Sequence, residues 1–206
     1  ILPEAMSNGI CSLKPAVDRL ALVCEMAFDQ DGKRGKAKFY DAVIHSHARL
    51  TYTEVSDWLG GNTNSKNDSI YTQLEPLVSL YRLLDHQRAK RGALEVETVE
   101  PIFKFNDDKK IESVEPRSRN DAHKIIEECM IAANVAAAEA LSSDEYPALY
   151  RNHDKPDSDK LDALKQFLVD LGLPAKFSEP PTPESVALVL EMAHDRPDRQ
   201  MVETMI

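Results

Sequence analysis

The chain has 206 residues, of which 42% are hydrophobic and 29% charged, so it can bury a core and is unlike a disordered protein. Its formal net charge of −10 argues against indiscriminate nucleic-acid binding through a basic surface, although a local basic groove remains compatible with it. No apolar run approaches the roughly 18 residues of a membrane-spanning helix. Three widely spaced cysteines predict reduced thiols in a cytoplasmic protein rather than a disulfide framework or a zinc site.

The two ends of the sequence predict a piece of a longer protein. The chain starts at Ile1 without an initiator methionine or a signal-peptide pattern, and it stops within an amphipathic run at residues 201–206. We therefore expect residues 1–206 to form a partial domain that is truncated at both ends. Strands cut from their neighbours would leave sheet edges unpaired, so we also expect the isolated fragment to self-associate through these edges.

The first third of the chain predicts a β-hairpin. Residues 18–28 and 36–50 have strand character and are separated by a turn signal, which favours a long hairpin. Residues at every second position share a face of a strand, and five apolar residues do so here. We expect the face that carries them to be half-buried: Leu20, Leu22, Cys24, Met26 and Phe28.

Helical patterns follow the hairpin. A capping box at residues 51–54 predicts a short helix that ends at Gly60. Apolar residues spaced by three and four positions then predict an amphipathic helix over residues 69–91, bent or restarted at Pro76 and ended by Gly92.

The second half of the chain mixes short strands with helices. Residues 120–141 are rich in alanine and apolar on most faces, which predicts a central helix buried on nearly all sides. This order of elements predicts an α+β fold in which mixed or antiparallel hairpins pack around the central helix, with additional C-terminal helices. Strands are predicted at residues 94–98, 103–105, 111–114 and 148–151, and further helices at residues 157–172 and 182–192.

Polar residues form a stripe along the predicted central helix. Asn120, His123, Glu127 and Asn134 point in similar directions because a helix turns by about 100° per residue. Polar groups on a buried helix need hydrogen-bond partners. The stripe therefore either pairs with neighbouring backbone or solvent, or forms one wall of a polar channel.

Histidines on the predicted hairpin raise the question of a metal site. His45 and His47 would lie on one face of the second strand, and a third ligand such as His153 would have to come from far along the chain. Without a matching ligand spacing, we interpret them as ordinary strand histidines and predict no metal site within the chain. The sequence also lacks the glycine-rich phosphate loops and the serine-hydrolase and zinc-protease motifs.

Four longer motifs are more specific than these periodic patterns. They are Asn-Gly-Ile-Cys-Ser-Leu at residues 8–13, His-Ala-Arg-Leu-Thr-Tyr at 47–52, Arg-Asn-Asp-Ala-His-Lys-Ile-Ile-Glu-Glu-Cys-Met at 119–130 and Arg-Asn-His-Asp-Lys-Pro at 151–156. In residues, order and approximate spacing the chain resembles the ribonuclease R and ribonuclease II family over nearly its whole length. The resemblance implies an internal fragment of an RNB-type catalytic domain, from a processive 3′-to-5′ hydrolytic exoribonuclease that degrades single-stranded RNA to nucleotide monophosphates.

The resemblance also implies roles for individual residues. Tyr52 falls at the family's active-site tyrosine and would orient the scissile phosphate, and Glu127 falls at a carboxylate that would accept hydrogen bonds from the hydroxyls of the 3′-terminal sugar. Asn120, His123 and Asn134 follow as weaker RNA-binding candidates because they share the stripe with Glu127.

Other parts of the family's machinery lie outside these motifs. One aromatic of its base-stacking clamp would fall near Val96, which has no aromatic face to offer a base. The family hydrolyses phosphodiesters with two metal ions, so the resemblance implies Mg²⁺ for the parent protein. Its metal-binding aspartates would precede Ile1, and we therefore expect the isolated fragment to be inactive. The alternative is a non-catalytic RNA-binding or scaffold protein with the same fold.

Overall fold

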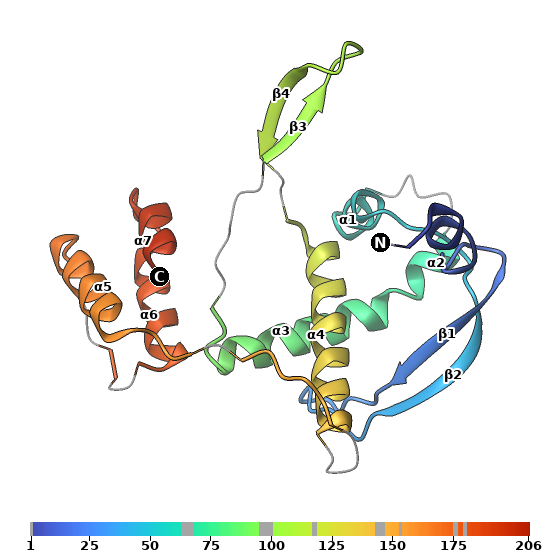
Figure 1. The fold of residues 1–206 in the computed structure, drawn as a ribbon, viewed down its shortest axis with the longest axis horizontal. Coiled ribbons are helices and arrows are strands. Elements are labelled where there is room, and N and C mark those ends of the chain that lie inside the picture. The colour runs from blue at the N-terminus through green and yellow to red at the C-terminus, as the bar shows by residue number, and fades with distance from the viewer. Residues whose placement is uncertain are drawn as a thin grey trace. The chain divides into compact units, whose positions relative to one another are not determined.

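The chain folds into two compact units, which consist of Ile1–Asp85 with Arg119–Ala148 and of His86–Ser118 with Leu149–Ile206. The described strands form two separate two-stranded antiparallel sheets, and helices make up most of the rest (Figure 1). This mixture of antiparallel hairpins and helices confirms the predicted α+β fold. The computed structural model describes residues 2–62, 68–94, 101–116, 119–142, 147–152, 154–174, 177–178 and 181–206.

The first unit contains the predicted long hairpin. Strands β1 (Asp18–Glu25) and β2 (Lys38–His45) pair without interruption, from Asp18 opposite His45 to Glu25 opposite Lys38. Both strands are shorter than predicted. A short helical segment, η1 (Met6–Ile10), precedes the hairpin and was not predicted.

The burial of this hairpin differs in part from the prediction. Leu20 and Leu22 are 82% and 74% exposed, whereas Ala21 and Val23 on the opposite face are half-buried. The remaining residues of the predicted face, Cys24, Met26 and Phe28, are half-buried as expected. Alternation shows which residues share a face, but both faces of β1 are apolar, so the pattern could not tell which one the rest of the unit covers.

Local sequence signals set the helix boundaries of this unit. Helix α1 (Tyr52–Leu59) begins after the predicted capping box and ends at Gly60. The predicted long helix is divided into α2 (Asp68–Thr72) and α3 (Glu75–Lys90). Pro76 lies in the first turn of α3, where its missing N–H costs no intrahelical hydrogen bond.

Helix α4 (Asp121–Leu141) has the predicted bounds, with Asn120 as its N-cap, and it packs against α1. Its buried residues follow one face of the helix: Ala122, Ile125, Glu128 and Ala136. Large apolar residues on its other faces are exposed: Ile126, Met130, Val135 and Leu141. The predicted burial thus holds along one face only. Alanine-rich composition did not reveal this, because alanine favours a helix whether it is buried or not.

The second unit contains another hairpin and three helices. Strands β3 (Pro101–Phe105) and β4 (Ile111–Pro116) pair antiparallel, as predicted. The apolar cluster of α5 (Ser158–Asp170), α6 (Pro183–Ala193) and α7 (Arg199–Met205) forms the core of this unit. Its buried members are Leu168, Leu173, Val189, Ala193 and Val202.

Two predicted strands have different outcomes. Residues 148–151 are irregular rather than extended in a ladder, so this prediction is wrong: a short apolar run becomes a strand only where a partner strand pairs with it. The predicted strand at residues 94–98 lies outside the described residues except for Leu94. Just before it, Gly92 has a φ of +71°, and a Cβ atom there would approach the backbone nitrogen of Glu184 to 2.7 Å, so only glycine fits.

None of the helices in the described part of the chain has the length and apolar character that a bilayer crossing requires.

Candidate functional site

Tyr52 is the first residue of α1, and the capping box beside it fixes its backbone. The Thr51 hydroxyl accepts a hydrogen bond from the Glu54 backbone N–H at 3.2 Å, and the Glu54 carboxylate accepts one from the Thr51 backbone N–H at 2.8 Å. The hydrogen bond from the Thr51 backbone, followed by that from its hydroxyl, lowers the pKa of Glu54. The Tyr52 side chain is 42% exposed, so a firmly held backbone presents this phenol to solvent.

The ring of Tyr52 stacks on the imidazole of His123 in the first turn of α4. The ring centroids are 3.9 Å apart and the planes differ by 17°. Nδ1 of His123 is 2.6 Å from Oδ1 of Asn120, which also accepts the His123 backbone N–H at 3.2 Å. The same ring nitrogen lies 3.4 Å from the backbone nitrogen of Asn120, so both the side chain and the backbone of Asn120 contact Nδ1. The imidazole is thereby tied to the helix cap.

Glu127 lies one turn beyond His123 on α4 and forms an ion pair with Arg119. Its side chain is 35% exposed, so the carboxylate remains accessible to a ligand. The next residue, Glu128, is buried. Burial and the charge of Glu128 raise the pKa of the neighbouring Cys129 thiol. Of the two adjacent carboxylates, Glu127 is therefore the one accessible to a ligand from solvent.

An apolar cavity of about 140 Å³ adjoins Tyr52. It lies among α1, α3, α4 and the segment before α1. Aliphatic side chains dominate its wall, which can receive a flat or aliphatic group but offers few hydrogen bonds. The lining residues are Leu50, Thr51, Tyr52, Val55, Leu74, Leu77, Ala122, Ile125 and Ile126.

The structure brings together some of the predicted site residues and not others. Asn120, His123 and Tyr52 form one connected group, and Glu127 follows one turn later. Asn134 is exposed and lies a further seven residues along, or about 10 Å at a rise of 1.5 Å per residue. Val96, at the predicted clamp position, lies outside the described residues.

Two features of the site were not predicted from sequence. The stack of Tyr52 on His123 joins α1 to α4, and a pattern within one segment carries no such information. Arg119, the partner of Glu127, belongs to the same motif but was not singled out. Asn120 followed by His123 at the third helical position has the spacing of a capping box, and this was the signal available for the cap.

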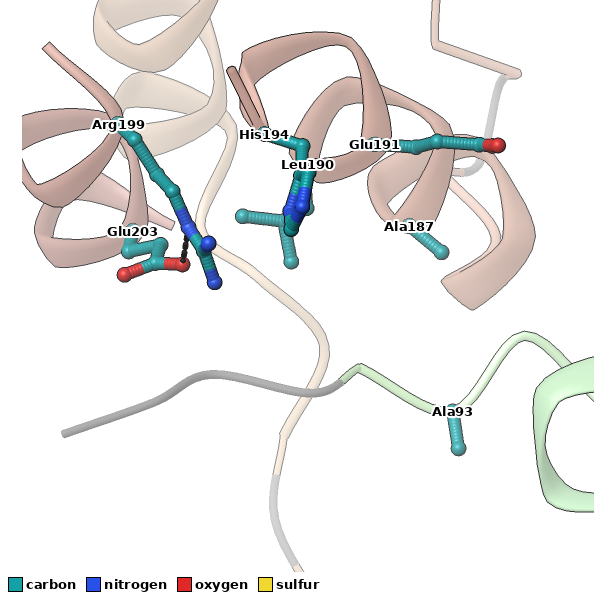
Figure 2. Close-up of a pocket in the computed structure, with 7 residues that line it drawn as sticks. All are labelled: Ala93, Ala187, Leu190, Glu191, His194, Arg199 and Glu203. Carbon is teal, nitrogen blue, oxygen red and sulfur yellow. Dashed lines mark hydrogen bonds and ion pairs between the residues drawn. The ribbon is translucent and has the colours of Figure 1, made fainter. Parts of the chain in front are cut away.

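A second cavity, of about 260 Å³, lies in the other unit and was also missed (Figure 2). Arg199 and His194 line it together with Glu191 and Glu203. Arg199 donates from Nε to the Glu203 carboxylate at 2.7 Å, as the dashed line in Figure 2 marks. This pairing offsets the charge of Arg199 and leaves the cavity with mixed polarity.

No group of three or more potential metal ligands occurs within the described part of the chain. The rings of His45 and His47 are 6.0 Å apart, and Nδ1 of His45 lies 2.7 Å from the Asp18 carboxylate. His153 lies outside the described residues. These side chains do not fit a catalytic magnesium site, so the roles of Tyr52 and Glu127 are derived below without a metal step.

Comparison with known proteins identifies the family. The RNB domain matches residues 1–206. The chain belongs to the RNB family. Its relatives include ribonuclease R of Vibrio parahaemolyticus, 46% identical over 208 residues, an alignment that covers 100% of this chain and 25% of that protein. The chain spans about a quarter of the length of the curated RNB relatives it matches.

Solved structures of RNB proteins support the same assignment. Ribonuclease R of Mycoplasma genitalium in complex with ribose-methylated single-stranded RNA superposes with a TM-score of 0.92 at 28% identity, over 99% of this chain and 32% of that chain. The same enzyme in complex with double-stranded RNA gives a TM-score of 0.91 at 29% identity, over 99% of this chain and 37% of that chain. The chain therefore has the fold of the corresponding part of ribonuclease R.

Proposed function

We propose that this chain binds the 3′ end of single-stranded RNA within a processive 3′-to-5′ hydrolytic exoribonuclease that releases nucleotide monophosphates. The observation that carries the proposal is the placement of Tyr52 and Glu127 around His123, in a chain that matches the RNB domain throughout. Ribonuclease R relatives and an RNA-bound structural neighbour support RNA as the ligand.

Tyr52 is suited to the phosphate of the RNA. Its phenol donates a hydrogen bond without carrying charge, so it can orient a phosphate oxygen at the scissile position. One ring face is covered by His123, and the side chain also borders the apolar cavity. Tyr52 thus lies between a polar group and an apolar surface.

Glu127 is suited to the terminal ribose. A carboxylate accepts hydrogen bonds from vicinal hydroxyls and can read the 2′-hydroxyl that distinguishes RNA from DNA. A negative group beside RNA would repel the phosphates, and the ion pair with Arg119 offsets that repulsion. The same pair fixes the direction of the carboxylate.

The proposal for the intact protein includes Mg²⁺, held by residues other than those described here, as the family resemblance implies. We accordingly propose that the 206-residue chain alone releases no nucleotides. We further propose that it self-associates through its sheet edges, because β1 and β2 pair only with each other among the described strands. Light scattering over a range of concentrations tests this, and a constant monomer mass would contradict it.

The test of the proposed site is Glu127→Ala in the intact protein, with Glu191→Ala on α6 as the control. Loss of charged hydrogen bonds to the sugar should slow nucleotide release roughly 10- to 100-fold. The melting temperature should stay close to that of the unmodified protein, because the Glu127 side chain is half-exposed. Glu191→Ala should keep the full rate.

Substrate chemistry sharpens this test. The unmodified enzyme should prefer an RNA with a 3′-terminal ribose to the same RNA ending in a 2′-deoxynucleotide, and Glu127→Ala should lose most of that preference. An unchanged preference would remove Glu127 from the site. If the intact protein binds RNA but releases no nucleotide with Mg²⁺ present, it is instead a non-catalytic RNA-binding protein.

A further inference from the structure

We propose that His123 is a positioning residue for Tyr52: the imidazole, locked by Asn120, fixes the plane of the tyrosine ring and thereby the place of its hydroxyl. This inference rests on the proposed function, and it gives His123 a role different from direct contact with RNA. Two observations support the proposal: the ring of Tyr52 stacks on the imidazole of His123, and Asn120 contacts that imidazole.

The backbone contacts at the start of α1 do not fix the orientation of the Tyr52 ring. The capping box fixes the backbone of Tyr52, but rotation about the bond between Cβ and the ring is broad and roughly two-fold. The side chain is also 42% exposed, so much of its surface lacks protein neighbours. A flat group against one face is the contact that restricts this rotation.

His123 supplies that flat group. The centroid separation of 3.9 Å and the interplanar angle of 17° place the two rings face to face. Such contact restricts the tilt of the phenol and leaves the hydroxyl, at the ring edge, free to meet a ligand. The face of the imidazole toward Tyr52 is covered, so that face cannot stack on an RNA base.

The imidazole restrains the tyrosine ring more firmly because its own orientation is fixed. Nδ1 of His123 lies 2.6 Å from Oδ1 of Asn120 and 3.4 Å from the Asn120 backbone nitrogen, and the same Oδ1 caps α4 by accepting the His123 backbone N–H at 3.2 Å. The orientation of the imidazole is therefore coupled to the cap of a 21-residue helix. Asn120 contacts His123 and His123 contacts Tyr52, so these three residues connect the N-terminus of α4 to the phenol.

Kinetics of the intact exoribonuclease test this role with two substitutions at one position. His123→Leu keeps the bulk but removes the flat ring, and it should lower kcat about tenfold, less than the roughly 100-fold loss that a 1 Å misplacement can cause. The Kd for RNA, measured without Mg²⁺, should change by less than about twofold, because binding energy from the rest of the strand is retained. His123→Phe keeps a ring that can stack but loses the contact with Asn120, so its kcat should lie between those of His123→Leu and the unmodified enzyme.

A double-mutant cycle separates positioning from an independent role. If His123 acts through Tyr52, the variant His123→Leu/Tyr52→Ala should be no slower than Tyr52→Ala alone. If His123→Leu and Tyr52→Ala lower kcat independently, so that their effects multiply in the double variant, the proposal is overturned. It is also overturned if His123→Phe is as slow as His123→Leu. His86→Leu, at an exposed histidine of α3, is the matched control and should keep the full rate.

A spectroscopic measurement keeps the proposal testable if the protein proves not to be a nuclease. In the intact protein labelled with 3-fluorotyrosine, Tyr52→Phe identifies the fluorine resonance of Tyr52. His123→Leu should shift and broaden that resonance because the ring current and the restraint are lost, whereas His86→Leu should leave it in place. A resonance that does not respond to His123→Leu overturns the positioning role; absent nuclease activity with a responsive resonance overturns only the proposed function.

Discussion

The cluster of α5, α6 and α7 and the first two turns of α4 differ in what their side chains do. In the cluster, Leu168, Val189, Ala193 and Val202 have almost no exposed surface, and they contact one another. At the start of α4, polar and aromatic groups contact one another while they remain partly exposed. Apolar burial of the first kind stabilises a fold, whereas the second arrangement fixes polar and aromatic groups where solvent can reach them.

The largest expected effect belongs to the cluster. Leu168→Ala removes a fully buried side chain and should lower the free energy of unfolding by about 2–5 kcal/mol. Val169→Ala, at the exposed neighbour on the same helix, should change it by no more than about 0.5 kcal/mol. Denaturant unfolding of the intact protein measures both.

The activity of Leu168→Ala then separates the two regions. Below its melting temperature, this variant should release nucleotides at the rate of the unmodified enzyme per folded molecule. A stable but slow Leu168→Ala variant would show that the cluster also shapes the site.

The second half of α4 gives an intermediate case. Ala136 is buried within the first unit, so Ala136→Leu should overpack its surroundings and cost about 1–3 kcal/mol. Ala138 is exposed on the same helix, and Ala138→Leu should be nearly neutral. Equal costs at the two positions, measured by thermal unfolding, would contradict the burial of one face of α4.

Local chemistry explains which parts of the fold could be predicted. Three signals act within a few residues: the capping box at Thr51, the N-cap Thr182 followed by Pro183, and the left-handed backbone of Gly92. The exposure of Leu20 and the irregular backbone at residues 148–151 depend on which distant segments come near. A single sequence contains no direct signal for that.

The candidate site also has features that the sequence predicted and features that only the structure reveals. Tyr52 and Glu127 were found through family motifs, which record a shared role rather than a contact. The polar stripe placed His123 and Glu127 on one side of a helix, because helical periodicity is local. The stack of His123 on Tyr52 and the ion pair of Arg119 with Glu127 required the folded chain. This stack is the reason why we propose a positioning role for His123 in place of the predicted contact with RNA.

The smallest expected effect concerns the polar pair beside the cluster, Arg196 and Asp198. The guanidinium donates to both carboxylate oxygens of Asp198, at 2.8 and 2.7 Å, and also to the Leu171 carbonyl at 2.9 Å. The hydrogen bonds from Arg196 hold the pKa of Asp198 below the ordinary value of 3.8. This pair lies outside the proposed site, so Asp198→Asn should affect unfolding and leave the rate of nucleotide release unchanged.

The pH dependence follows from the direction of that shift. A carboxyl group with a lowered pKa in the folded state stabilises the fold fully above its unfolded pKa, and this contribution is lost as the pH falls through the folded pKa. The difference in melting temperature between the unmodified protein and Asp198→Asn should therefore be constant near neutral pH and shrink below pH 3.8. Arg196→Gln should remove most of the same pH-dependent part, because Arg196 is the main cause of the lowered pKa, together with a pH-independent part from the lost hydrogen bond to Leu171. Because either substitution alone removes the pair, the double variant should show no further pH-dependent loss. Independent pH-dependent losses in the two single variants would mean that Asp198 owes its low pKa to some group other than Arg196.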